Sequence, residues 1–254
     1  MKKLNYRLNT DFKDSQPSII FIHGLFGNLN NFNTLAKEFN IKKYNTLQVD
    51  LRNHGQSPHS FIMNYKIMAQ DILCLLDDLN IKKCIVIGHS MGGKVAMTLP
   101  MLLKNHVIKI IIMDIAPTTY ATNQNNNIFL AINSVTKSHI TSKNEAFILM
   151  NKFIHDQKTI FFLLKSFRTG QWIFNIDSIQ KNYSALNSWE KYNPWLGDVL
   201  FIAGRYSPYI KYHHYCEIYQ QFPKSLIHIV QSGHWVHIEQ KDSVVSIIDD
   251  FLLK

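Results

Sequence analysis

Residues 84–92 read Cys-Ile-Val-Ile-Gly-His-Ser-Met-Gly. An unbroken apolar run, residues 84–87, ends at Gly88, and a pattern with apolar residues at helical spacing begins just after Ser90. Glycines two residues before and after a serine allow a turn so tight that larger side chains would clash. A Gly-x-Ser-x-Gly segment between a strand and a helix is typical of an exposed nucleophilic serine held at a sharp turn. The segment therefore predicts that Ser90 is a nucleophile.

Similar apolar runs occur on both sides of this segment. They are continuous rather than alternating, which is typical of strands covered on both faces by helices. The expected strands are Ser18–Ile22, Tyr44–Val49, Cys84–Ile87, Val107–Met113, Val199–Ala203 and Leu226–Val230. Helical patterns fall between them at Ile67–Leu79, Met91–Leu103, Tyr209–Phe222 and Ser243–Leu253. This alternation predicts an α/β chain with a mostly parallel, doubly wound sheet.

Residues 117–194 interrupt the alternation, because they contain no convincing strand. Four helices are expected there, at Asn126–Val135, Lys143–Phe153, Thr159–Phe167 and Ser178–Leu186. We expect residues 117–194 to form a helical cap inserted in a core made of residues 1–116 and 195–254. With the serine turn, this organisation predicts the α/β-hydrolase fold.

A general base is expected after the last strand, because the order in this fold is serine, acid, histidine. His234 follows Ser232-Gly233 directly after that strand and is the expected base. His237 is expected to be structural, and the side chain of His89 should point away from the serine.

The loop after the first apolar strand, His23-Gly24-Leu25-Phe26-Gly27, is expected to supply half of an oxyanion hole. In this fold one backbone N–H comes from that loop and one from the residue after the nucleophile. The expected donors are Leu25 and Met91, with Phe26 as the alternative to Leu25.

The acid is harder to assign. It usually follows the penultimate strand, but here that strand is followed by Arg205-Tyr206 and no carboxylate. Asp114 ends the strand expected beside the serine strand and is the preferred candidate. Asp177 in the cap is the alternative, and a Ser-His dyad assisted by water is the third option.

Composition and charge limit the other classes of function. The chain has 254 residues and a net charge of +9, but its basic residues are scattered and match no nucleic-acid-binding motif. Three cysteines do not form a disulfide framework. No apolar stretch approaches the length of a membrane span, and no signal core or metal-binding spacing is apparent. We expect a cytoplasmic monomer or small homo-oligomer without metal or cofactor.

Seven segments together resemble serine esterases of the α/β-hydrolase superfamily, including enterobacterial acyl-CoA esterases and mitochondrial α/β-hydrolase-domain proteins. The shared segments are residues 23–27, 50–55, 88–94, 114–117, 162–167, 207–209 and 233–237. The resemblance implies hydrolysis of short acyl esters and acyl-CoA thioesters without a cofactor. The resemblance also implies that no acid follows the penultimate strand, which favours Asp114. Arg205-Tyr206 departs from the Gly-Asn of the family, which leaves the substrate preference open.

The predicted reaction is acyl transfer through an acyl-enzyme on Ser90, with a small-molecule ester or acyl-CoA as substrate. Carbon–carbon bond hydrolases and cofactor-free haloperoxidases share the fold and remain alternatives, as does a non-enzymatic binding protein. Arg168, Arg205 and Lys94 are candidate anchors for an anionic substrate.

Overall fold

The computed structural model describes residues 3–10, 17–102, 106–121 and 126–253. Its centre is a seven-stranded sheet in the order β1-β3-β2-β4-β5-β8-β9, parallel except for β1, which pairs antiparallel with β3. The strands are β1 (Tyr6–Asn9), β2 (Ser18–Ile22), β3 (Thr46–Val49), β4 (Cys84–His89), β5 (Val107–Met113), β8 (Asp198–Gly204) and β9 (Ser225–Val230). The predicted doubly wound α/β-hydrolase fold is confirmed.

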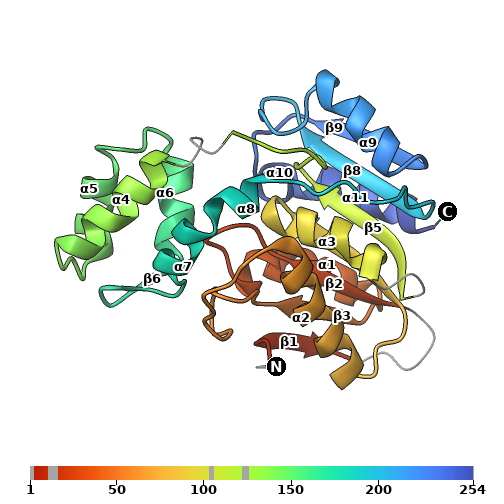
Figure 1. Cartoon of the computed structure of the whole chain (residues 1–254), viewed down its shortest axis with the longest axis horizontal. Helices are drawn as coiled ribbons and strands as arrows, with labels where there is room; N and C mark the ends of the chain where they lie inside the picture. Colours follow the sequence, from red (N-terminus) through yellow and green to blue (C-terminus); the bar gives the residue numbers. More distant parts are fainter. Residues whose placement is uncertain (1–2, 11–16, 103–105, 122–125, 254) are drawn as a thin grey trace.

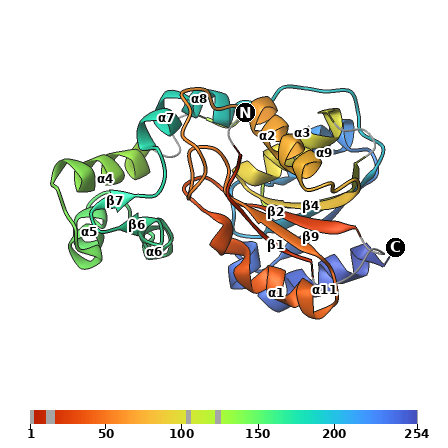
Figure 2. The same cartoon turned by 90° about the horizontal axis from the view of Figure 1, so that it is seen from below.

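Helices cover both faces of this sheet (Figures 1 and 2). One face carries α1 (Asn33–Ile41) and α11 (Lys241–Leu252), and the other carries α2 (Tyr65–Asp78), α3 (Met91–Leu102) and α9 (Tyr215–Gln221). Because strand residues alternate between the faces, two apolar clusters form. The smaller lies under α1 and α11, and the larger lies under α2 and α3 and continues into residues 126–187.

The segment between β5 and β8 is largely helical and lies beyond one end of the sheet (Figures 1 and 2). Its elements are α4 (Asn126–Lys137), α5 (Lys143–Met150), α6 (Gln157–Leu164), β6 (Phe167–Arg168), β7 (Gln171–Trp172), α7 (Ile176–Lys181) and α8 (Tyr183–Asn187). We call residues 117–194 the cap. The expectation of a cap without strands is wrong, because β6 and β7 form a short hairpin around Thr169 and Gly170.

Several predicted helix boundaries also differ. The helix expected over 209–222 begins only at Tyr215, after a 3₁₀ turn (η2, Tyr212–His214), and the one expected over 178–186 is two helices that meet at Asn182. Leu103, the expected end of α3, lies outside the described residues. Besides the β6–β7 hairpin, the elements that the sequence did not predict include β1, α1, the 3₁₀ turn η1 (Leu29–Phe32) and α10 (Val236–Glu239).

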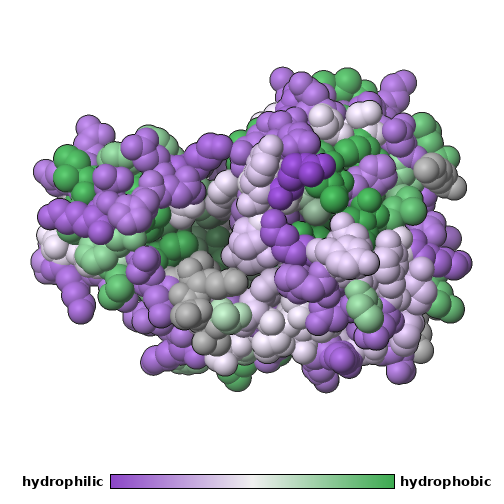
Figure 3. All heavy atoms as spheres, turned by 90° about the horizontal axis from the view of Figure 1, so that it is seen from above, coloured by the Kyte–Doolittle hydropathy of each residue, from purple (hydrophilic) through white to green (hydrophobic). Residues whose placement is uncertain are grey.

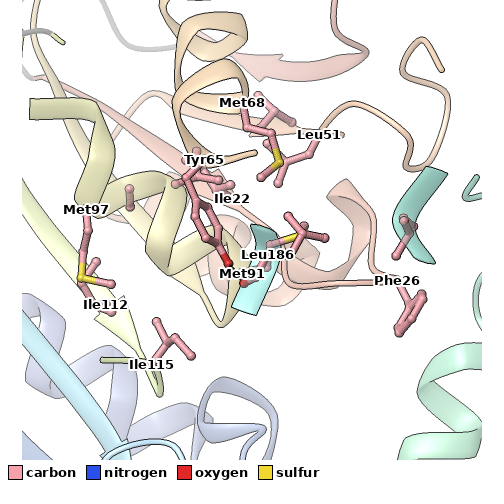
Figure 4. Close-up of a cluster of buried hydrophobic side chains, with 14 of the residues drawn as sticks. Ile22, Phe26, Leu51, Tyr65, Met68, Met91, Met97, Ile112, Ile115 and Leu186 are labelled. Carbon is pink, nitrogen blue, oxygen red and sulfur yellow. Dashed lines mark hydrogen bonds between the residues drawn. The ribbon is translucent and has the colours of Figure 1, made fainter. Parts of the chain in front are cut away.

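Lys94 on α3 ties both ends of the cap to the core. Its buried ammonium group donates hydrogen bonds to the carbonyl oxygens of Thr118 at 2.8 Å, Asn187 at 3.1 Å and Ser188 at 2.9 Å. Burial lowers the pKa of Lys94 to about 7. Nearby, the Tyr65 hydroxyl points toward α8 and donates to the carbonyl of Leu186 (Figure 4). The cap therefore starts and ends beside the helix that follows Ser90.

Candidate active site

Ser90 stands at the turn between β4 and α3, at the carboxyl edge of the sheet. Its backbone is in the left-handed region, with φ of 53°, and its N–H donates to the carbonyl of Met113 at 3.0 Å. A Cβ on Gly88 would lie 2.3 Å from the carbonyl oxygen of Gly92, and one on Gly92 would lie 2.1 Å from that of Ile22. Only glycines therefore allow the chain to turn this tightly around the serine.

Asp114 lies one residue beyond β5 and is fully buried. One carboxylate oxygen, Oδ2, lies 2.7 Å from Nδ1 of His234 and also accepts a hydrogen bond from the Ser207 hydroxyl. The other, Oδ1, accepts the backbone N–H of Gly204 at 2.9 Å. A buried carboxylate needs such donors. Asp114 is therefore fixed in one orientation, against the imidazole.

Asp177, the alternative acid, is exposed in the first turn of α7. In the described part of the chain, the carboxylate that contacts His234 is that of Asp114. Strand order explains this contact. His234 follows β9, Asp114 follows β5, and β8 lies between these two strands, so their carboxyl ends meet at one edge of the sheet.

The imidazole of His234 is held by aromatic neighbours. The ring of Tyr209 lies 4.2 Å from it and that of His89 lies 4.6 Å from it, measured between centroids. His89 also lies within 2.9 Å, through Nε2, of the carbonyl oxygen of His234. Burial lowers the pKa of His89 well below its usual value, so a neutral ring donates this bond. His89 thus supports the backbone of His234.

The loop after β2 is braced by two histidines. Nε2 of His54 accepts the backbone N–H of Phe26 at 3.1 Å, and Nε2 of His23 accepts that of Leu51 at 3.0 Å. Burial lowers the pKa of His23 to about 4 and that of His54 to about 3, which keeps both rings neutral and able to accept. Phe26, the alternative oxyanion donor, therefore already has an acceptor for its N–H.

The N–H groups of Leu25 and Met91 are in a different situation. Met91 is the first residue of α3, where backbone N–H groups have no intrahelical partner. Among the described residues, neither N–H has a hydrogen-bond acceptor. Both therefore remain free to donate to a ligand.

Ser90 and His234 line one cavity of about 500 Å³. Its apolar wall comes from the cap through Ile128, Phe162 and Leu163, and from Trp235 in the core. The phenyl ring of Phe162 lies 4.1 Å from the Trp235 ring, and this contact joins cap to core. The surface between cap and core is hollowed, with hydrophobic side chains inside the hollow (Figure 3). The cavity can hold a small ligand with an apolar group.

Three contributors to this site were missed in the sequence. Ser207 follows the penultimate strand, where the acid of this fold usually lies, and its hydroxyl donates to Asp114. Tyr209 packs against His234, and His54 supports the loop after β2. Of the candidate anchors, Lys94 is buried and occupied by backbone carbonyls. Arg205 is exposed and its neighbour Tyr206, rather than Arg205, is among the residues lining the cavity of Ser90, whereas Arg168 lines a different one.

No helix in the described part of the chain is long and apolar enough to cross a bilayer. The same residues contain no group of three or more His, Cys, Asp or Glu side chains that could hold a metal ion.

Comparison with known proteins identifies the family. Residues 17–146 match the family described as alpha/beta hydrolase fold. Esterase YbfF of Escherichia coli K12 is 40% identical over 252 residues, which cover 98% of this chain and 99% of that protein. The sn-1-specific diacylglycerol lipase ABHD11 of Danio rerio is 33% identical, covering 95% of this chain and 80% of that protein.

Solved structures agree. A marine microorganism esterase superposes with a TM-score of 0.90 at 31% identity, covering 99% of this chain and all of that one. A meta-cleavage product hydrolase from Pseudomonas fluorescens shares the fold alone, with a TM-score of 0.73 at 19% identity. The chain belongs to the α/β-hydrolase family and is a hydrolase of the esterase/lipase type, resembling Esterase YbfF.

Proposed function

We propose that this protein hydrolyses short acyl esters or acyl-CoA thioesters through an acyl-enzyme on Ser90. One observation carries the proposal: Ser90 and His234 line the same cavity, and Nδ1 of His234 is hydrogen-bonded to the buried carboxylate of Asp114. That combination supports a serine nucleophile with an oriented base.

In the proposed reaction, Nε2 of His234 takes the proton of the Ser90 hydroxyl as the oxygen attacks the carbonyl carbon of the substrate. Asp114 holds the tautomer with hydrogen on Nδ1 and stabilises the imidazolium that forms. The N–H groups of Leu25 and Met91 stabilise the negative charge on the carbonyl oxygen, each contributing roughly 3 kcal/mol. His234 then protonates the leaving alcohol or thiol, and water, deprotonated by His234, releases the acyl group.

We assign the cap, residues 117–194, to the acyl side of this site. The apolar wall formed by Ile128, Phe162 and Leu163 fits a hydrocarbon group better than a charged one. An apolar acyl group buried there contributes about 0.8 kcal/mol per methylene. Esters and thioesters differ in the leaving atom rather than in the acyl group, so both classes fit this wall.

The test is the Ser90→Ala variant assayed on p-nitrophenyl acetate. Without the nucleophile, kcat should fall by roughly 10⁶-fold, the order seen when the serine of such a site is removed. Ser184→Ala, an exposed serine on α8, is the matched control and should keep full activity. Near-wild-type turnover by Ser90→Ala would end the proposal.

A substrate panel separates this reaction from others of the fold. Esters, acyl-CoA thioesters and vinylogous diketones are offered at equal concentration. We expect turnover of esters and thioesters. Turnover confined to the diketones would identify a carbon–carbon bond hydrolase instead.

A further inference from the structure

A second cavity, of about 610 Å³, lies between the cap and the core. It shares no lining residue with the cavity of Ser90, although residues of α10 (Val236–Glu239) line both. Its walls include four basic side chains: Lys143, Lys165 and Arg168 from the cap and Lys241 from α11. No aspartate or glutamate is among the lining residues in the described part of the chain.

Three of these four cations have no carboxylate partner among the described residues. Lys241 is paired with Glu38 at 2.9 Å and with Asp242 at 3.0 Å, so its charge is largely offset. In the described residues, no carboxylate forms an ion pair with Lys143, Lys165 or Arg168. The three side chains are exposed, but cations gathered around one hollow add their potentials and make it positive inside. The cavity therefore attracts anions.

Neutral donors complete the wall. Asn30 and Asn31 both line the cavity. The Asn30 amide oxygen accepts from Arg7 at 3.0 Å, and that of Asn31 accepts the N–H of Asn28 at 2.6 Å. With their oxygens engaged, both amides keep their NH₂ groups as donors. The lining thus offers both cations and hydrogen-bond donors.

The ligand class follows from charge and size. A phosphate group carries up to two negative charges and three acceptor oxygens, and arginine binds it with two parallel N–H donors. A cavity of about 610 Å³ is within the usual range for a small organic ligand and is larger than one phosphate requires. We propose that this cavity binds an organic molecule carrying more than one phosphate group, such as a nucleoside diphosphate.

This site does not depend on hydrolysis at Ser90, since the two cavities share no lining residue. Isothermal titration calorimetry with ADP, inorganic pyrophosphate and adenosine, at about 0.15 M salt to screen surface charge, tests it. We expect ADP to bind at one site, more tightly than pyrophosphate, and adenosine not to bind measurably. The Ser90→Ala variant should bind ADP as the wild type does.

Charge-reversal variants locate the site. Lys165→Glu and Arg168→Glu should each raise the Kd for ADP by at least about tenfold, because a bound phosphate loses a cation and meets an anion. Lys83→Glu is the matched control. It makes the same charge change on an exposed residue just before β4, and its Kd should stay within about twofold of wild type. Circular dichroism verifies that every variant is folded, which is expected because all three side chains are exposed.

Three results would overturn the proposal. The first is no binding of ADP or pyrophosphate by the folded wild type. The second is an equal rise in the Kd for ADP in Lys83→Glu, which would show that the overall charge of the protein, rather than this cavity, controls binding. The third is pyrophosphate binding as tightly as ADP, which would show that the organic part of the ligand does not contribute to binding.

Discussion

Asp114 shows at the scale of one residue how the site is held together. Its φ of 54° lies in a region that aspartate tolerates better than most residues do, and its N–H donates to the carbonyl of Ile202 at 2.9 Å. The backbone thus stays attached to β8 while the carboxylate turns toward His234. Ser207 and Gly204 then satisfy the lone pairs that His234 leaves free.

Asp114→Asn tests this role. The amide is nearly the same size, but its NH₂ group can face Nδ1 and favour the wrong tautomer of His234. We expect kcat for p-nitrophenyl acetate to fall by about 10⁴-fold. Asp177→Asn makes the same change at the alternative acid, which is exposed, and should leave kcat unchanged. A large loss in Asp177→Asn with little loss in Asp114→Asn would reverse our assignment of the acid.

At the scale of elements, α6 contributes Phe162 and Leu163 to the apolar wall of the cavity that contains Ser90. Phe162 points inward and packs against Trp235, whereas the adjacent Phe161 is exposed and stacks on Phe147 at 5.1 Å. Lys158 at the start of α6 forms an ion pair with Glu239 of α10 at 2.9 Å. The lysine is largely exposed, so the ion pair adds little stability.

Phe162→Leu should change chain-length preference. Losing the ring opens the apolar wall, and each methylene newly buried there contributes about 0.8 kcal/mol. The ratio of kcat/KM for p-nitrophenyl octanoate to that for the acetate should rise about fivefold to tenfold. Phe161→Leu is the control. An equal rise of this ratio in that variant would show that Phe162 does not contact the acyl group.

The elements that were predicted from sequence are those with a strong local signal. Long apolar runs identified the six parallel strands, and the glycine spacing identified the turn at Ser90. β1 was missed because Tyr-Arg-Leu-Asn is a short, mostly polar edge strand that depends on pairing with β3. The β6–β7 hairpin was missed because each strand has only two residues, although Thr169-Gly170, both with positive φ, is a hairpin turn.

The site was less predictable than the fold, because its contacts join distant parts of the chain. The hydrogen bond from Ser207 to Asp114 spans 93 positions, and that from Phe26 to His54 spans 28. Neither leaves a periodic pattern in the sequence. Ser207 follows β8, where the acid of this fold usually lies, and the carboxylate comes instead from Asp114 after β5.

At the scale of the whole molecule, four buried histidines connect the loops around the site. They are His23, His54, His89 and His237. Burial lowers the pKa of His237 to about 3, and it lowers the pKa values of the other three as well. In the unfolded chain all four titrate near pH 6.5. Below that pH the unfolded state therefore binds more protons than the folded state.

This difference predicts acid sensitivity. Stability should be constant above pH 6.5 with respect to these groups and should fall as the pH drops from 6.5 toward 4. Each histidine contributes about 1.4 kcal/mol per pH unit to the loss in free energy of unfolding. Urea unfolding between pH 6.5 and pH 5 measures the slope, and His237→Gln should reduce it, because one ring with a lowered pKa is removed. A slope near zero in this range would show that the four rings are not held neutral.

A fluorophosphonate probe tests most directly whether His234 activates the Ser90 hydroxyl. Peptide mass spectrometry after labelling should find one phosphonyl adduct per chain, on the peptide containing Ser90. The His234→Ala variant should label at least about 10³-fold more slowly, because the serine loses its base. Labelling at another residue, or an equal rate in His234→Ala, would show that His234 does not activate Ser90.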